Sequence, residues 1–400
     1  MLIVQKYGGT SMGSTERIQN VANRVSKSAE GNNLVVVVSA MSGVTDEILG
    51  YGKSFSPIPN ERDLDMALSS GEQISAALLS IALNAMGYKS IAFNGRQAGI
   101  ITDSNHTKAR IKDINTANIK QHLQDGYIVV VTGFQGLSDK GEITTLGRGG
   151  SDLSAVALAG ALHADLCEIY SDVDGIYTTD PRIEEKAKKI ERISYDEMLE
   201  LASMGAKVLL NRSVELAKKW SVPLYAKSSF SDDKGTLITT EENIMEKPIV
   251  SGIALDKNQA RVSLIGIKDK PGIAAELFSK LASANVNVDM IVQTIGRDSK
   301  TNLDFTVPKN ELDKAKLTLE AFKVNADLID YDHEVAIVSI VGVGMKSHSG
   351  VAAKAFEAMA NDNINIRMIS TSEIKISMLI DLKYAELSVR TLHAAYELDR

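Results

Sequence analysis

An internal repeat in the C-terminal part of the chain limits its possible folds more than any other feature of the sequence. Residues 272–291 (GIAAELFSKLASANVNVDMI) align with residues 350–369 (GVAAKAFEAMANDNINIRMI), 78 positions later. Nine of the twenty aligned positions are identical, and several others exchange similar apolar residues. Self-similarity of this extent indicates one structural unit that occurs twice, rather than two unrelated segments.

Each copy of the repeat lies in the same pattern of expected elements. A strand-like segment precedes it, at 260–267 and at 335–343, and a glycine begins its helix. An alternating strand, expected at 285–294 and at 363–372, a further strand and a final helix follow in both copies. The order β-α-β-β-α predicts two small ferredoxin-like units. We place them at residues 246–330 and 331–400, and this order is compatible with strand exchange between them.

The remainder of the chain alternates strands with helices. Short and nearly continuous apolar runs occur at 2–7, 33–40, 127–134 and 164–172. Such runs are typical of strands that are covered on both faces, and helical patterns lie between them. The alternation predicts an α/β domain around a mostly parallel sheet. A polar stretch ends this pattern at Pro248, so we place the domain at residues 1–245.

Charge and cysteine content exclude several classes of protein. A formal net charge of −7 over 400 residues, without a dominant cluster of Lys and Arg, argues against a nucleic-acid partner. The single cysteine, Cys167, excludes an intrachain disulfide, and its apolar surroundings indicate a buried strand residue. The sequence does not start with a charged leader and an apolar segment, and no apolar run reaches about 18 residues. We therefore expect a cytoplasmic protein without a membrane partner.

Glycine-rich segments follow the expected strands of the first domain. They lie at 6–13, 39–46, 131–136 and 146–152. Parallel strands have their carboxyl ends at the same edge of a sheet, where ligands bind and helix N-termini offer free N–H groups to anions. Together with Lys6 and Arg148, these segments predict a phosphate-binding crevice. Neither GxxxxGK[ST] nor GxGxxG occurs between a strand and a helix, so the motifs indicate neither a P-loop protein nor a dinucleotide-binding dehydrogenase.

Five segments resemble the signature blocks of the aspartate kinase family, in the family's order. They are KYGGTSMGSTERI (6–18), LSSGEQISAALLS (68–80), TTLGRGGSDLSA (144–155), YSDVDGIYTTDPR (170–182) and SMGAKVL (203–209). The repeated C-terminal units resemble the paired regulatory ACT domains of that family, so the resemblance covers essentially the whole chain. It implies a three-layer α/β/α amino-acid-kinase catalytic domain followed by two ACT domains, in a monofunctional enzyme. This family phosphorylates the side-chain carboxylate of L-aspartate with ATP to 4-phospho-L-aspartate, the first step toward lysine, threonine, methionine and diaminopimelate.

The resemblance implies a nucleotide site around the first and fourth blocks. Lys6 matches the family lysine at the phosphates, and Gly8 and Gly9 would allow close approach of the backbone. The matching ATP-binding positions are Lys6, Tyr7, Gly8, Gly9, Ser39, Ser171, Asp172, Tyr177, Arg182 and Lys207. We expect Mg²⁺ to arrive with ATP, without a protein ligand. The fifth block continues as Leu-Asn-Arg at 210–212 where many members have His-Pro-Arg, which leaves details of the adenine site open.

The second and third blocks match the positions that hold the acceptor in this family. The resemblance implies that Glu72 faces the amino group of aspartate and that Arg148 pairs with its α-carboxylate, as suits a planar guanidinium. The matching acceptor positions are Thr45, Glu72, Arg148, Gly149, Gly150 and Ser151, and the catalytic positions are Lys6, Arg148 and Asp152. Asp152 aligns with an aspartate that organises the lysine and the metal-bound phosphates. The acceptor carboxylate, with a reference pKa of about 3.9, is already ionised at neutral pH and needs no general base.

ACT pairs in this family bind amino-acid effectors at their interfaces. The matching positions are Asp269, Asn287, Val288, Asp289, Gln293, Thr294, Asn365, Ile366, Ser372 and Glu373. Asp289 aligns with Arg367 in the second copy, so we expect the two copies to bind differently. Residues 344–350 and the region of Gln293 resemble members inhibited by lysine, alone or with threonine. Such units pair across subunits, which predicts a dimer or a tetramer.

Two other interpretations remain open. A different amino-acid kinase, such as an acetylglutamate kinase or a glutamate 5-kinase, would share the fold but does not combine the Arg148 block with twin ACT units. A catalytically inactive amino-acid sensor would not need the charges of Lys6, Glu72, Arg148 and Asp152. Length and the lack of a dinucleotide fingerprint argue against a fused homoserine dehydrogenase.

Overall fold

The computed structural model describes the chain except residues 204–208, 245–247, 296–299, 321 and 323–324. The chain forms two compact units. The first unit comprises Met1–Ile176, Lys189–Ala202 and Lys207–Met245, and the second comprises Tyr177–Lys188, Ser203–Ala206 and Glu246–Arg400. The domain boundary that we placed between residues 245 and 246 lies outside the described residues.

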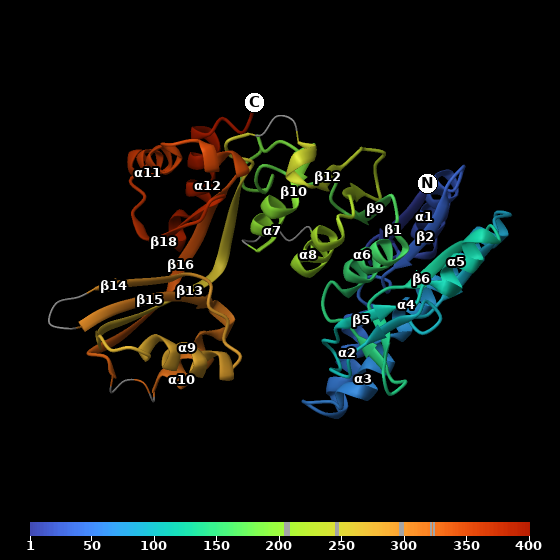
Figure 1. The fold of residues 1–400 in the computed structure, drawn as a ribbon, viewed down its shortest axis with the longest axis horizontal. Coiled ribbons are helices and arrows are strands. Elements are labelled where there is room, and N and C mark those ends of the chain that lie inside the picture. Colours follow the sequence, from blue (N-terminus) through green and yellow to red (C-terminus); the bar gives the residue numbers. More distant parts are fainter. Residues whose placement is uncertain (204–208, 245–247, 296–299, 321, 323–324) are drawn as a thin grey trace. The chain divides into compact units, whose positions relative to one another are not determined.

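An eight-stranded sheet forms the centre of the first unit, in the order β10-β12-β11-β9-β1-β2-β6-β3 (Figure 1). The strands are β1 (Leu2–Tyr7), β2 (Asn33–Val38), β3 (Ser90–Phe93), β6 (Ile128–Thr132), β9 (Leu166–Ser171), β10 (Arg192–Ser194), β11 (Leu224–Ser228) and β12 (Thr236–Thr239). Neighbouring strands are parallel except β11 and β12. The four apolar runs form β1, β2, β6 and β9, which confirms the predicted sheet.

Helices pack on both faces of this sheet, which confirms the three-layer α/β/α fold. α1 (Thr15–Ser28) and α4 (Ser70–Ala85) share one apolar core with alternate residues of β2. α6 (Gly150–Leu162) is buried along most of its length and contacts β1, β2 and β9. The other helices of this unit are α2 (Val44–Phe55), α3 (Glu61–Leu68), α5 (Ala117–Gln124), α7 (Tyr195–Ser203), α8 (Asn211–Trp220) and a 3₁₀ turn at Glu241–Asn243. Leu34 to Val38 are all buried, because both faces of β2 are covered.

A second, four-stranded sheet in the first unit was not predicted. Its order is β5-β4-β7-β8. The strands are β4 (Ile100–Thr102), β5 (Ile111–Ile114), β7 (Gln135–Ser138) and β8 (Ile143–Thr145). Each has only three or four residues, which is too short for an alternating apolar pattern to stand out. β8 leads directly into the glycine-rich segment before α6, so this sheet helps to position that segment.

The helical run Glu61–Ala85 is long and apolar enough to cross a membrane by length and composition alone. It consists of α3 and α4, and half of its apolar window is buried inside the protein. Leu79 and Leu83 of α4 are fully buried in the core beneath the central sheet. Packing within the first unit therefore accounts for the apolar character of this run.

A six-stranded antiparallel sheet forms the second unit, in the order β14-β15-β13-β16-β18-β17. Its elements are β13 (Gly252–Lys268), α9 (Ile273–Ser283), β14 (Ile291–Ile295), β15 (Lys300–Pro308), α10 (Leu312–Glu320), β16 (Leu328–Val341), α11 (Val351–Asn361), β17 (Ile366–Thr371), β18 (Lys375–Asp381) and α12 (Ala385–Ala395). Short 3₁₀ turns lie at Lys309–Glu311, Val343–Ser347 and Leu382–Tyr384. Within this unit, α9 and α10 lie at one end of the sheet and α11 and α12 at the other (Figure 1). The long strands β13 and β16 pair along both halves, so each contributes to both apolar cores.

The second strand of each repeat begins later than predicted. The alternating pattern suggested strands from 285 and from 363, whereas β14 begins at Ile291 and β17 at Ile366. Asn285 and Asn363 occupy equivalent repeat positions, and their φ angles are 52° and 56°. Asn tolerates this left-handed conformation just after the end of a helix. The first Asn of each pattern therefore ends a helix instead of beginning a strand.

Candidate active site

The carboxyl ends of four parallel strands meet at one edge of the central sheet. Tyr7, the last residue of β1, lies in register with Val38 of β2 and Tyr170 of β9, and Val38 lies opposite Thr132 of β6. The loops after these strands are therefore neighbours, and they begin with Gly8, Ser39, Gly133 and Asp172. The predicted crevice at this edge has the expected backbone arrangement.

Lys6 and Asp152 form a buried ion pair at this edge. Lys6 Nζ lies 2.7 Å from Asp152 Oδ1, and both residues are at most 9% exposed. Asp152 lies in the first turn of α6, while Lys6 is the penultimate residue of β1. A Cβ atom at Gly8 would lie only 3.3 Å from Lys6 Nζ, so glycine leaves the ammonium group accessible from the loop. The pair therefore holds one cation in a fixed position beside bare backbone.

Glu72 lies in the first turn of α4 and is 3% exposed. Ala40 N donates a hydrogen bond of 3.0 Å to its Oε1 atom. Its Oε2 atom is buried and has no hydrogen-bond partner within the described part of the chain. Burial raises the pKa of Glu72 to about 7, against the lowering effect of backbone hydrogen bonds. A cationic group of a ligand next to Oε2 would therefore stabilise the ionised form of this carboxylate.

Glycine at position 71 permits the close approach between α4 and the loop after β2. A Cβ atom there would lie 2.7 Å from Ala40 Cβ and 3.3 Å from Val44 Cγ1. Val44 begins α2 and precedes the half-buried Thr45. A Cβ atom at Gly9 would lie 3.0 Å from Ala40 O. The first turns of α2 and α4, which carry Thr45 and Glu72, and the loop of Gly9 therefore meet around Ala40.

Arg148 lies on the exposed turn between β8 and α6. Gly147 and Gly149 on either side have φ angles of 81° and 71°, which glycine adopts without strain. Gly150 N donates to Gly147 O at 2.9 Å and closes the turn. Ser151 packs against Gly133, where a Cβ atom would lie 2.7 Å from it. Arg148 has no ion pair among the residues that the structure describes, so its guanidinium is available to a ligand.

The remaining positions of the predicted nucleotide site are divided between the two units. Ser39 is half-buried and Asp172 is exposed, and both belong to the first unit with Ser171. The Tyr7 side chain is fully buried and stacks on Tyr170, so only its backbone faces the crevice. Lys207 lies outside the described residues.

Tyr177 and Arg182 belong to the second unit. The segment that carries them is held there by two contacts of Thr178. Its carbonyl accepts a hydrogen bond of 2.7 Å from Ile253 N, and its hydroxyl lies 3.0 Å from His393 Nε2. Arg182 forms an exposed ion pair of 2.7 Å with Asp180. These two predicted positions therefore belong to a different compact unit from Lys6.

Comparison with known proteins decides the family. The chain matches the Amino acid kinase family over residues 1–226 and the ACT domain over residues 262–321 and 338–396. It is 65% identical to an aspartokinase of Helicobacter pylori (strain J99), over 100% of both chains. The chain belongs to the aspartate kinase family. The predicted enzyme class is thereby confirmed, and the first and second units are called the kinase unit and the ACT unit below.

Two solved structures of E. coli aspartokinase III share the fold over nearly the whole chain. The structure in complex with aspartate and ADP has a TM-score of 0.83 and 26% identity, over 99% of each chain. The structure in complex with lysine and aspartate has a TM-score of 0.78 and 26% identity, over 98% of this chain and 99% of the other. The arrangement of a kinase domain followed by ACT domains is therefore that of known aspartate kinases.

A cavity of about 600 Å³ lies in the second half of the ACT unit. Ser372 and Glu373, two of the predicted effector positions, line it together with residues of 345–352. Glu373 Oε2 lies 3.9 Å from Lys346 Nζ across this region. The cavity thus offers charges of both signs, as a zwitterionic amino acid requires.

The predicted effector positions of the first repeat are engaged with protein neighbours. Asp289 accepts a hydrogen bond of 2.7 Å from Gln259 Nε2, and burial raises the pKa of Asp289. Asn287 N donates to Glu311, and Gln293 Nε2 donates to Thr301 at 3.3 Å. The other predicted positions are Asp269 in the β13–α9 loop, Val288 before β14, Thr294 in β14, Asn365 before β17 and Ile366 in β17. The predicted effector positions therefore have different surroundings in the two repeats.

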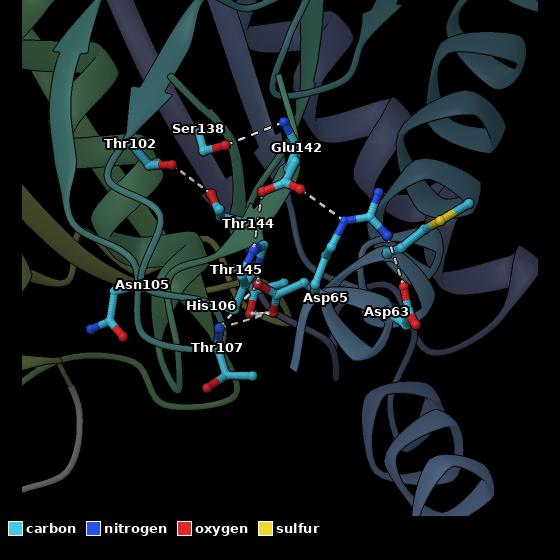
Figure 2. Close-up of polar contacts among 12 residues, drawn as sticks. Asp63, Asp65, Thr102, Asn105, His106, Thr107, Ser138, Glu142, Thr144 and Thr145 are labelled. Atoms are coloured by element: carbon cyan, nitrogen blue, oxygen red, sulfur yellow. Dashed lines mark hydrogen bonds and ion pairs between the residues drawn. The ribbon is translucent and has the colours of Figure 1, made fainter. Parts of the chain in front are cut away.

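The sequence analysis did not predict a buried polar cluster that lies beside the turn of Arg148 (Figure 2). Its centre is Asp65 of α3, which contacts His106, Thr107 and Thr145. One signal was available, because Asp65 and Leu68 are the two buried residues of α3 and lie three positions apart. A carboxylate on the apolar face of a helix indicates a buried partner.

Proposed function

We propose that this chain transfers the γ-phosphoryl group of ATP to the side-chain carboxylate of L-aspartate, which yields 4-phospho-L-aspartate and ADP. A carboxylate oxygen bonds to the γ-phosphorus while the bond from that phosphorus to the bridging oxygen of ADP breaks. The acceptor is ionised before the reaction, so no side chain has to remove a proton. The aspartate and ADP complex of E. coli aspartokinase III supports this pair of ligands.

The observation that carries the proposal is the unpartnered oxygen of Glu72. A buried carboxylate oxygen without a donor is costly unless a ligand supplies one. The ammonium group of an amino acid is such a donor, and the Ala40 loop connects Glu72 to the loop of Lys6. The site therefore suits an amino acid next to a phosphate.

Acceptor binding is assigned to residues around Glu72 and the α6 turn. Glu72 accepts from the ammonium group of aspartate, and Arg148 donates to its α-carboxylate. The remaining acceptor positions are Thr45, Gly149, Gly150 and Ser151. When its α-ammonium group and α-carboxylate are both held, the side-chain carboxylate of aspartate is directed toward Lys6 and the loop after β1.

Phosphate binding is assigned to Lys6 and the glycines after β1. The Asp152 carboxylate holds Lys6 in place, so the cation need not reorganise as charge moves in the transition state. The nucleotide positions are Tyr7 through its backbone, Gly8, Gly9, Ser39, Ser171, Asp172, Tyr177, Arg182 and Lys207. No group of three or more His, Cys, Asp or Glu residues that could hold a metal occurs among the residues described. We assign Mg²⁺ to the phosphates of ATP, where it would neutralise their charge.

Regulation is assigned to the ACT unit, with lysine as the effector, alone or with threonine. The lysine complex of E. coli aspartokinase III and the cavity beside Glu373 support this assignment. The catalytic domain would comprise residues 1–245, and the ACT domains residues 246–330 and 331–400. We further propose a homo-oligomer formed through the ACT domains, and a cytoplasmic role at the start of lysine, threonine, methionine and diaminopimelate synthesis.

A coupled assay of ADP release with three acceptors tests the proposed reaction. L-aspartate should be preferred over L-glutamate and N-acetylglutamate, and Arg148→Ala should raise the KM for aspartate by about 100-fold. Preference for another acceptor would favour a different amino-acid kinase. Absence of ADP release with all three would favour an inactive sensor.

A further inference from the structure

Asp65 is a fully buried carboxylate in the kinase unit, 0% exposed, on helix α3. Thr107 N donates to both of its oxygens, at 3.1 and 3.0 Å. His106 Nδ1 lies 2.8 Å from Oδ2, and Thr145 Oγ1 donates to Oδ1 at 2.5 Å (Figure 2). Donors from the loop of residues 106–107 and from strand β8 therefore converge on one carboxylate, which compensates for its burial.

The outer side of this cluster is closed by Glu142. Glu142 Oε2 lies 3.6 Å from His106 Nε2, and its Oε1 accepts a hydrogen bond of 2.9 Å from Arg62 Nε. Figure 2 shows Glu142 and His106 near Asp65. The Asp65 carboxylate is thus surrounded by protein groups, and a ligand in the crevice cannot touch it.

Thr145 connects Asp65 to the turn that carries Arg148. Thr145 is 1% exposed and is the last residue of β8, three positions before Arg148. Its carbonyl accepts a hydrogen bond of 2.9 Å from Ala109 N, and Arg212 Nη1 donates to the carbonyl of the next residue, Leu146. Both residues at the base of the turn are therefore fixed by buried contacts.

The partner loop at 106–108 is in a strained conformation on the same side. Thr107 has a φ angle of 64°, which is uncommon for a β-branched residue. The two hydrogen bonds from its N–H to Asp65 hold it there, and a Cβ atom at Gly147 would lie 3.2 Å from Thr107 O. Asp65 therefore fixes both the turn of Arg148 and the loop on which that turn rests.

We propose that Asp65 is a positioning residue for acceptor binding, which holds the Arg148 turn through the Thr145 hydroxyl and the Thr107 backbone. The proposal rests on the proposed role of Arg148 at the α-carboxylate of the acceptor. Asp65 contributes no charge to the ligand. It orients the guanidinium, and a loss of orientation weakens the binding of a carboxylate more than the binding of the nucleotide.

Thr145→Val tests the contact with the smallest change in shape, because valine replaces the hydroxyl by a methyl group. We expect the KM for aspartate to rise roughly tenfold, while the KM for ATP changes less than about twofold. Thr145→Ser keeps a hydroxyl and should restore aspartate affinity. An unchanged KM for aspartate, or an equal rise for both substrates, would overturn the proposal.

Asp65→Asn and Asp63→Asn form a matched pair on the same helix. Asp63 is exposed and pairs with Arg62 at 2.9 Å, so its change should leave both KM values near those of the unchanged enzyme. Asp65→Asn should give the same selective rise as Thr145→Val, measured after circular dichroism confirms the fold. If Asp65→Asn does not fold, the KM values of Thr145→Val and Thr145→Ser test the positioning role of Asp65 by themselves.

Combination with Arg148→Ala separates this inference from the proposed function. In that background Thr145→Val should have no further effect on the KM for aspartate, because the turn no longer carries the guanidinium. If Arg148→Ala alone leaves the KM unchanged, the proposed role of Arg148 fails. If Arg148→Ala raises the KM and Thr145→Val adds a further independent rise, the inference about Asp65 fails and the proposed function stands.

Discussion

Glu72 is the residue at which burial and ligand binding compete most directly. Burial raises its pKa to about 7 in the ligand-free protein, so the carboxyl is largely neutral at pH 6. A neutral acid does not attract the ammonium group of aspartate. We therefore predict that kcat/KM for aspartate falls roughly tenfold per pH unit below about pH 7, while kcat/KM for ATP stays nearly level. A steady-state pH profile at saturating concentrations of the other substrate measures both.

Two comparisons test the assignment of this pH dependence to Glu72. Glu72→Gln should have a high KM for aspartate at every pH and no inflection near pH 7. The ligand-free protein should lose part of its stability as pH rises from 4.5 to about 7, because its folded state holds the Glu72 proton more tightly than the unfolded chain does. An inflection that persists in Glu72→Gln would show that another group titrates.

The Lys6–Asp152 pair makes a separate prediction for the chemical step. Asp152→Asn removes the charge that holds Lys6 in place, so the ammonium is no longer fixed beside the phosphates. We predict a fall in kcat on the order of 100-fold with little change in the KM for aspartate. A fall confined to the KM for aspartate would contradict the separation between the acceptor and phosphate ends of the site.

At the scale of elements, the approach of α4 to the loop after β2 sets the position of Glu72. Gly71→Ala would place a Cβ atom 2.7 Å from Ala40 Cβ, so helix and loop must separate and the Ala40 N to Glu72 bond must lengthen. We predict a roughly tenfold higher KM for aspartate. Gly50→Ala in α2 is the matched control, because no atom lies within 4 Å of its added Cβ. Equal effects of both changes would exclude the proposed contact.

Helices and strands could be predicted from the sequence where the local pattern of apolar residues was strong. β1, β2, β6 and β9 were predicted because burial on both faces requires continuous apolar runs. The strands β4, β5, β7 and β8 are too short to produce such a signal. The sheet that supports the turn of Arg148 was therefore not predicted. The strands at Ile291 and Ile366 were predicted to begin too early, since a pattern of alternating residues does not show a left-handed Asn.

The candidate site was predictable where residues act through a motif, and not where they act through tertiary contact. The glycines and charges near Lys6 and Arg148 stand in recognisable segments. Asp65 and Thr145 are 80 positions apart in sequence, and their contact arises only when α3 packs beside β8. The burial of the Tyr7 ring likewise follows from its stacking on Tyr170 across two strands.

At the scale of the whole molecule, the chain combines a kinase unit with an ACT unit that contains a charged cavity. We predict that Glu373→Gln, which removes a charge from that cavity, raises the inhibition constant for lysine about tenfold. Inhibition is measured as aspartate-dependent ADP release, relative to the uninhibited rate of each variant. Glu357→Gln on the exposed face of α11 is the control of equal charge change. Indifference of the unchanged enzyme to lysine would exclude lysine as the effector.

The central claim is that Arg148 holds the α-carboxylate of an aspartate that accepts the phosphoryl group. β-Alanine is aspartate without that carboxylate, so the KM values for both acceptors in the unchanged enzyme and in Arg148→Ala test the claim directly. The account predicts that Arg148→Ala raises the KM for aspartate about 100-fold, toward the value for β-alanine, and leaves the KM for β-alanine unchanged. An equal rise for both acceptors, or no rise for aspartate, would contradict it.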